Sequence, residues 1–170
     1  MRKDIKPMVR IALLAAVYTV ISLALAPFSF GNIQVRIAEA LTLLPLLYKP
    51  SIWGLSLGCF LTNLLGALMG VNPTGLLDSV LGTLATFLAA YGTYYFRDKR
   101  VAGMPLLSLL CPVVLNFWIV GAELAYLYMP ENVWLGTLLF GSEVAIGELI
   151  AVGIGYLVLP FIRRSQIFQD

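Results

Sequence analysis

The sequence has no histidine, only two cysteines and few charged residues. Lysine, arginine, aspartate and glutamate make up 12% of its 170 residues, against about 25% in ordinary soluble domains. Without histidine, the chain lacks the commonest metal ligand and the commonest general base. Cys59 and Cys111 lie far apart within apolar runs, which is typical of small core residues rather than of a metal or redox pair. We therefore expect no metal site, no cofactor and no enzymatic activity, and the net charge of +2 gives no indication of nucleic-acid binding.

What the chain has in excess is apolar sequence. Hydrophobic residues make up 60% of the chain and the mean hydropathy is +0.91, as in integral membrane proteins. A spanning helix needs about 20 apolar residues, so the chain has room for about six spans joined by short loops. We predict an all-α, six-transmembrane-helix bundle that forms a single transmembrane domain over residues 1–170. The predicted spans are residues 8–26, 33–48, 52–70, 76–96, 104–128 and 133–162.

The distribution of lysine and arginine predicts the orientation of this bundle. Ten of the eleven cations lie in the N-terminal residues up to Arg10, after the last predicted span, or in the loops 49–51 and 97–103. Cytoplasmic loops carry an excess of lysine and arginine, so we expect both termini to be cytoplasmic. The exception is Arg36, which lies near the outer end of the second predicted span.

Arg36 and Glu39 are three residues apart in a segment that is otherwise mostly apolar. Residues at this spacing are neighbours on a helix surface, so the two side chains can share one face and can form an internal ion pair. Ionisable groups inside a membrane are costly, and they usually mark a substrate or ion path. This pair therefore predicts a functional site within the bundle.

Further polar residues are expected mostly in the outer half of the membrane. At about 1.5 Å per residue, Glu39, Asn63, Glu123 and Glu143 lie about 8 to 14 Å from the outer ends of their spans. Two more, Asn116 and Glu148, lie about 18 and 21 Å deep. Four carboxylates in so small a bundle predict an acidic pocket that opens to the outside.

Helical periodicity indicates which of these side chains share a face. Asn116 and Glu123 are seven residues apart and share one face of the fifth span, and we expect Tyr126 to continue it. Glu143 and Glu148 diverge by about 140°, so only one of them can point into the pocket, and the sequence does not say which. Two other polar residues have a structural alternative. Asn63 can serve as a hydrogen-bonded link between helices instead, and we assign Asp78, in the first turn of its helix, to the helix dipole.

These residues carry a resemblance to a known family. Residues 34–42, QVRIAEALT, resemble the opening signature of the QueT family, and residues 75–86, 120–124 and 147–149 fit it as well. Members of this family are substrate-binding (S) components of energy-coupling factor (ECF) transporters in the bacterial cell membrane, proposed to import queuosine precursors. The resemblance covers about residues 8 to 160.

The resemblance implies partners: a transmembrane coupling subunit and two cytoplasmic ATPases. S components of this kind dock through small residues of their first span, and here Ala12 and Ala16 supply such a pair. The chain has no G-x-x-x-x-G-K-[ST] loop, so ATP hydrolysis is expected from the partners.

The resemblance also implies a ligand, a 7-deazaguanine such as preQ0, preQ1 or queuine. The guanine-like edge of such a ligand presents two adjacent N–H donors, which match one carboxylate, and aromatic side chains can stack on its ring. We expect the substrate-binding residues to be Arg36, Glu39, Asn63, Asn116, Glu123, Tyr126 and Glu148. The alternative is a standalone secondary or proton-coupled transporter that uses the same carboxylates, although such carriers usually contain repeats and we find none.

Overall fold

The computed structural model of this chain describes residues 5–29 and 35–165, and within them the fold is helical. Arg2, Lys3 and the first two residues of the predicted second span lie outside the described residues. The described part contains one isolated β-bridge, between Val101 and Met104. The helices are α1 (Ile5–Ala24), α2 (Ala26–Ser29), η1 (Ile37–Leu46), α3 (Ser51–Leu68), α4 (Leu76–Tyr95), α5 (Leu106–Tyr128), η2 (Pro130–Asn132) and α6 (Val133–Ser165).

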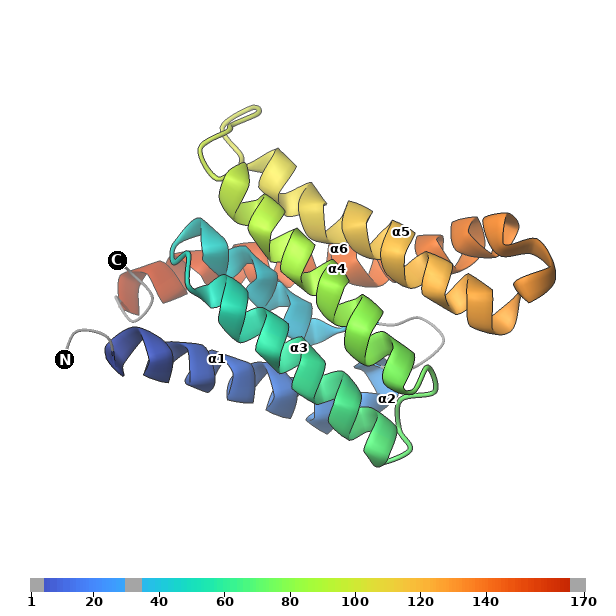
Figure 1. The fold of residues 1–170 in the computed structure, drawn as a ribbon. Coiled ribbons are helices and arrows are strands. Elements are labelled where there is room, and N and C mark those ends of the chain that lie inside the picture. Colours follow the sequence, from blue (N-terminus) through green and yellow to red (C-terminus); the bar gives the residue numbers. More distant parts are fainter. Residues whose placement is uncertain (1–4, 30–34, 166–170) are drawn as a thin grey trace.

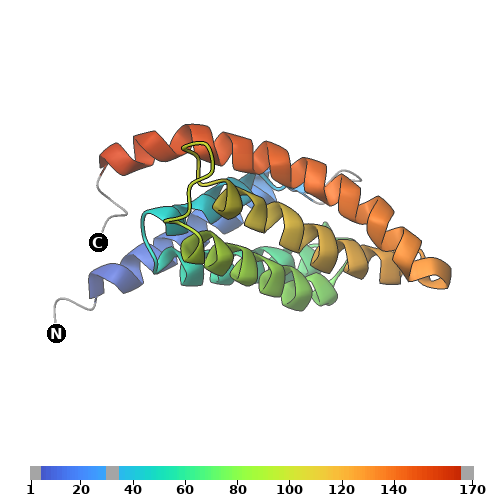
Figure 2. The same ribbon diagram turned by 90° about the horizontal axis from the view of Figure 1, so that it is seen from above.

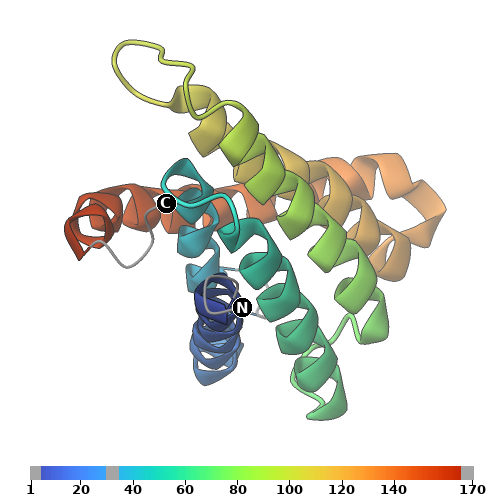
Figure 3. The ribbon, with the colours of Figure 1, turned by 60° about the vertical axis from the view of Figure 1, so that its left-hand side comes forward.

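The five long helices surround η1. Helix α1 packs against α3, α3 against α4, α4 against α5, and α5 against α6. The η1 helix contacts all five of them (Figures 1 and 3). Seen from above, α6 extends along one side of the bundle from end to end (Figure 2). The segment that carries Arg36 and Glu39 is therefore the central element of the molecule.

The chain runs back and forth along the bundle, so that α1 begins and α6 ends at the same end (Figure 1). The connections after η1 and after α4 lie at this end too. Of the nine lysines and arginines in the described residues, eight lie here and Arg36 does not. We call this end the basic end: it carries Lys6, Arg10, Lys49, Arg97, Lys99, Arg100, Arg163 and Arg164.

The second predicted span differs from the other five. Five helices are long and apolar enough to cross a membrane, and they match the predicted spans closely. By contrast, η1 is a 3₁₀-helix of ten residues, about 20 Å long at 2.0 Å per residue, which is short of the roughly 30 Å hydrocarbon core. Pro45 has no N–H to donate to the carbonyl of Leu41, and the Thr42 hydroxyl donates to the carbonyl of Glu39 at 2.5 Å. Both features weaken an α-helical pattern here.

Glycines allow the helices around η1 to approach closely. A Cβ on Gly58 of α3 would lie 2.8 Å from the Cβ of Tyr18 on α1. A small residue at this position therefore permits close packing of α1 on α3. Between α5 and α6, a Cβ on Gly121 would lie 2.7 Å from the Cα of Gly141. Gly155 of α6 likewise leaves room for the carbonyl of Ala40 in η1.

Candidate functional site

A buried ion pair lies at the start of η1, in the half of the bundle away from the basic end. Arg36 Nη2 donates to Asp78 Oδ2 at 2.5 Å, and the two residues are 7% and 1% exposed. Asn72 Nδ2 donates to the same oxygen at 3.2 Å, and Asn63 Nδ2 donates to the backbone carbonyl of Asp78 at 2.9 Å. A Cβ at position 82 would clash with Asp78 Oδ1, so Gly82 gives the carboxylate its room. Asp78 is thus held in place by three other side chains.

This pair corrects the sequence-based interpretation of two residues. The recorded salt bridge of Arg36 is to Asp78, 42 residues away, and not to Glu39. Asp78 does lie in the first turn of α4, where a carboxylate complements the helix dipole, but its closest charged partner is the guanidinium. The available signal was that a cation inside a membrane needs a partner, and that Asp78 starts its helix at the same end at which η1 begins.

Glu39 is bound by hydrogen bonds that link three helices. One of its oxygens accepts from the hydroxyl of Tyr18 on α1, and also from Thr86 Oγ1 on α4 at 3.0 Å. The residue is 1% exposed. Its other oxygen has no hydrogen-bond partner among the described residues. Glu39 therefore connects η1 to α1 and α4.

Two further carboxylates are buried with little hydrogen bonding. Neither oxygen of Glu123, nor Oε2 of Glu148, has a hydrogen-bond partner in the described part of the chain. These residues are 2% and 4% exposed. Glu143 is exposed, which answers the question left open by periodicity: of the two acidic residues on α6, Glu148 points inward. A buried carboxylate without donors is costly, so these oxygens are suited to a ligand that brings N–H groups.

A narrow space lies beside these carboxylates. Arg36, Asn116, Val120, Val144 and Glu148 line it, and it has no room for a water molecule. Glu123 is one helical turn from Val120 on α5. Binding sites for small molecules measure about 300–1,000 Å³, so the site is closed in this conformation. A much larger groove lies at the basic end, away from the carboxylates.

Three of the seven predicted site residues line this space, and Glu39, Asn63, Glu123 and Tyr126 do not. Arg36, Asn116 and Glu148 line the same space, whereas Asn63 has the linking role between α3 and α4 that was its alternative. Tyr126 is 66% exposed, so the expectation that it continues the inward face of α5 is wrong. It is about 60° around the helix from Glu123 and close to the end of α5, where this helix projects beyond α3 and α4 (Figure 1).

The predicted docking residues lie on the outer surface of α1. Ala12 and Ala16 are exposed, whereas Leu14, Ala15 and Tyr18 are buried against the rest of the bundle. The exposed face of α1 therefore presents two small side chains four residues apart, which is a spacing that allows another helix to come close.

Comparison with known proteins agrees with this description. The family model for the QueT transporter matches residues 8–164, which is nearly the whole chain. No curated protein and no solved structure matched. A transporter family and five helices able to cross a membrane point to a multi-pass membrane transporter rather than an enzyme. The chain belongs to the QueT transporter family.

Proposed function

We propose that this chain is the substrate-binding component of an ECF-type importer and that it captures a 7-deazaguanine queuosine precursor from outside a bacterial cell. The observation that carries the proposal is the set of buried carboxylate oxygens of Glu123 and Glu148 without donors in the described residues. We infer that the chain crosses the plasma membrane six times, with η1 completing the second crossing. Non-α backbone at membrane depth is tolerated where protein surrounds it, and η1 contacts all five long helices.

The ligand chemistry follows from the groups around the narrow space. A deazaguanine edge presents two N–H donors side by side, and one carboxylate can accept both of them. An aminomethyl cation on the same ring would suit the second carboxylate. The guanidinium of Arg36 can donate to the ring carbonyl, while Asp78 balances its charge. Glu39 already accepts two hydrogen bonds from protein hydroxyls, so we assign it to positioning η1 and assign ligand binding to Glu123, Glu148 and Asn116.

Binding requires the site to open, because the space among these residues is smaller than a ligand pocket. Since Asn116 and Val120 belong to α5 and Val144 and Glu148 to α6, the movement must separate side chains of these two helices from η1. The backbones of α5 and α6 themselves are in close contact at Gly121 and Gly141. We therefore expect the α5–α6 pair to move as one unit.

The test of this function is ligand binding by Glu123→Gln. The substitution replaces an acceptor oxygen by an N–H donor, so that a ligand N–H faces another N–H, at a cost of about 1–3 kcal/mol. Affinity should fall by roughly tenfold to a few hundredfold. Calorimetry of the purified chain with preQ0, preQ1 and queuine measures it, and Glu143→Gln, which changes an exposed carboxylate of α6, should bind like the wild type. Unchanged affinity in a folded Glu123→Gln variant would remove Glu123 from the site.

The proposed partners are a transmembrane coupling subunit and two cytoplasmic ATPases, with Ala12 and Ala16 on the docking face. Ala16→Leu should abolish ATP-driven uptake in the assembled transporter and leave ligand binding to the isolated chain unchanged, because it fills the surface that another helix must approach. Ala24→Leu, an exposed alanine at the far end of α1, is the matched control. Uptake by the chain alone would favour secondary transport instead.

A further inference from the structure

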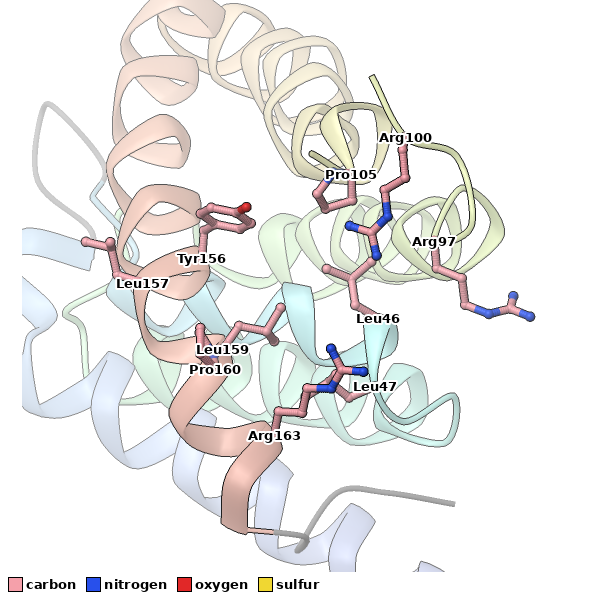
Figure 4. A pocket seen from close by; sticks show the side chains of 10 residues that line it. All are labelled: Leu46, Leu47, Arg97, Arg100, Pro105, Tyr156, Leu157, Leu159, Pro160 and Arg163. Carbon is pink, nitrogen blue, oxygen red and sulfur yellow. The ribbon is translucent and has the colours of Figure 1, made fainter. Parts of the chain in front are cut away.

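A groove of about 420 Å³ lies at the basic end. It lies between the end of η1, the connection from α4 to α5, and the last turns of α6 (Figure 4). The carboxylates of the candidate site belong to the other half of the bundle, so the groove is separate from that site.

The polar part of the groove is cationic. Arg97, Arg100 and Arg163 line it, and the described residues of its lining include no carboxylate. In Figure 4, Arg100 and Arg163 extend toward one another from opposite sides of the opening, whereas the guanidinium of Arg97 points away. Arg97 lies over the ring of Tyr94, 4.0 Å from its centroid, and pairs with Asp98 at 3.4 Å. Because they face one another across the opening, Arg100 and Arg163 are the two side chains that can contact one anion from both sides.

The rest of the lining is apolar and continues onto the surface of α6. Leu46, Leu47 and Leu159 form part of the wall. Leu157 and Tyr156 also line the groove, and they are 72% and 37% exposed. These two residues lie two turns before Arg163 and Arg164, the charged residues that end α6. The groove thus joins an apolar helix surface to a pair of guanidinium groups at the level where a membrane interior meets its polar face.

We propose that this groove binds one anionic phospholipid, with the phosphodiester between Arg100 and Arg163 and an acyl chain along Tyr156 and Leu157. Guanidinium groups match the geometry of phosphate oxygens. The inference rests on the proposed orientation, because anionic lipids are concentrated in the cytoplasmic leaflet. It does not depend on which solute the candidate site takes.

The combination of charge and apolar wall favours a lipid over two other occupants. A soluble anion would use the arginines but would gain nothing from Leu157 and Tyr156. An acidic protein segment would meet the eight cations of the whole basic end, and would not need a narrow groove beside α6. A phospholipid is the ligand that presents a phosphate and a hydrocarbon chain together at this depth.

The test compares two variants with the same loss of charge. In Arg100→Gln/Arg163→Gln both arginines of the groove are neutralised, and in Lys99→Gln/Arg164→Gln their sequence neighbours, which do not line it, are neutralised. The full-length protein is titrated with phosphatidylglycerol and with phosphatidylcholine, and bound lipid is counted by native mass spectrometry. The groove variant loses the charge-assisted hydrogen bonds of both guanidinium groups to the phosphate, so it should bind phosphatidylglycerol roughly 30-fold more weakly, which is about 2 kcal/mol. The control variant keeps both guanidinium groups of the groove and should stay close to the wild type.

Several results would overturn the proposal. Equal weakening in both variants would mean a diffuse attraction to the basic end. Equal binding of the two lipids would mean an apolar groove without phosphate recognition, and displacement by millimolar glycerol phosphate would mean a soluble-anion site. Retention of phosphatidylglycerol only when a coupling subunit is present would mean a protein interface. Because calorimetry with deazaguanines reports on the candidate site alone, failure of that function leaves this result unaffected. Labelling of a cysteine introduced at Lys99 from outside intact cells would refute the orientation itself.

Discussion

The two ends of this bundle treat charge in opposite ways. At the basic end, eight cations lie on short connections and helix ends, and their groove is open. In the other half, one arginine and four carboxylates, those of Glu39, Asp78, Glu123 and Glu148, are buried around a closed space. Charges at a membrane surface can be satisfied by water and lipid head groups, whereas charges inside it need partners from the protein or from a ligand.

The buried charges themselves are of two kinds: some are paired within the protein, and others are proposed to bind the ligand. The pair of Arg36 and Asp78 is internal to the protein and holds the start of η1 to α4. By contrast, Glu123 and Glu148 have oxygens without donors among the described residues, which costs stability and which the proposed ligand would offset. We therefore expect ligand to stabilise this chain against unfolding, in proportion to its concentration relative to its dissociation constant.

The strongest test of the difference between the two ends is to remove one charge from each and to compare the losses of stability. Arg36→Gln leaves Asp78 buried without its cation, and such a loss costs about 3–5 kcal/mol of stability. Arg97→Gln removes the cation from an exposed pair with Asp98, whose side chain is 81% exposed, and should cost at most about 1 kcal/mol. Unfolding of the purified protein in detergent measures both.

The apolar replacement of both buried charges provides the control. Arg36→Met/Asp78→Leu should recover much of the lost stability, because a buried ion pair can often be exchanged for well-packed apolar residues. If Arg36→Gln and Arg97→Gln lowered the stability equally little, the pair of Arg36 and Asp78 would be no better protected from water than a surface pair.

A second prediction concerns how tightly the half of the bundle away from the basic end is packed. Gly121→Ala would place a Cβ 2.7 Å from the Cα of Gly141, so α5 and α6 must separate, at a cost of about 1–3 kcal/mol. Gly153→Ala makes the same substitution within α6, but nothing lies within 4 Å of its Cβ, and alanine in a helix is favoured over glycine by about 0.5–1 kcal/mol. Opposite shifts in the unfolding midpoint are expected. A stabilised Gly121→Ala variant would mean that the two helices are not in close contact.

The sequence predicted the basic end better than the other half of the bundle, for a physical reason. The segments rich in lysine and arginine mark the connections directly, and apolar runs mark the five long helices. The contacts within the bundle depend also on how each helix is rotated about its axis. Periodicity states that Glu143 and Glu148 diverge, but only the packing of α6 against η1 and α5 determines that Glu148 faces inward.

Local sequence patterns could not predict two other features of the half away from the basic end. The partner of Arg36 is 42 residues away in the chain, so its identity depends on tertiary structure. The 3₁₀ conformation of η1 arises where Thr42 and Pro45 weaken the α-helical pattern and five helices enclose the segment. An apolar run that contains one proline is equally compatible with a kinked α-helix. The failed expectation for Tyr126 has a similar origin, because exposure at the end of α5 depends on how far its neighbours extend.

The smallest expected effect lies in the turn that carries Arg100 at the basic end. Val101 and Met104 exchange two backbone hydrogen bonds, of 2.9 and 3.1 Å, around Ala102 and Gly103. Both central residues have positive φ, 51° and 80°, which is the pattern of a type I′ turn that prefers Asn-Gly. Alanine is disfavoured in this left-handed conformation. Ala102→Asn should therefore stabilise the protein, by about 0.5–1 kcal/mol, and Ala102→Val, a β-branched residue, should destabilise it. Because the turn is far from Glu123, deazaguanine binding should be the same in all three proteins, and a changed affinity would mean that the two ends of the bundle are coupled.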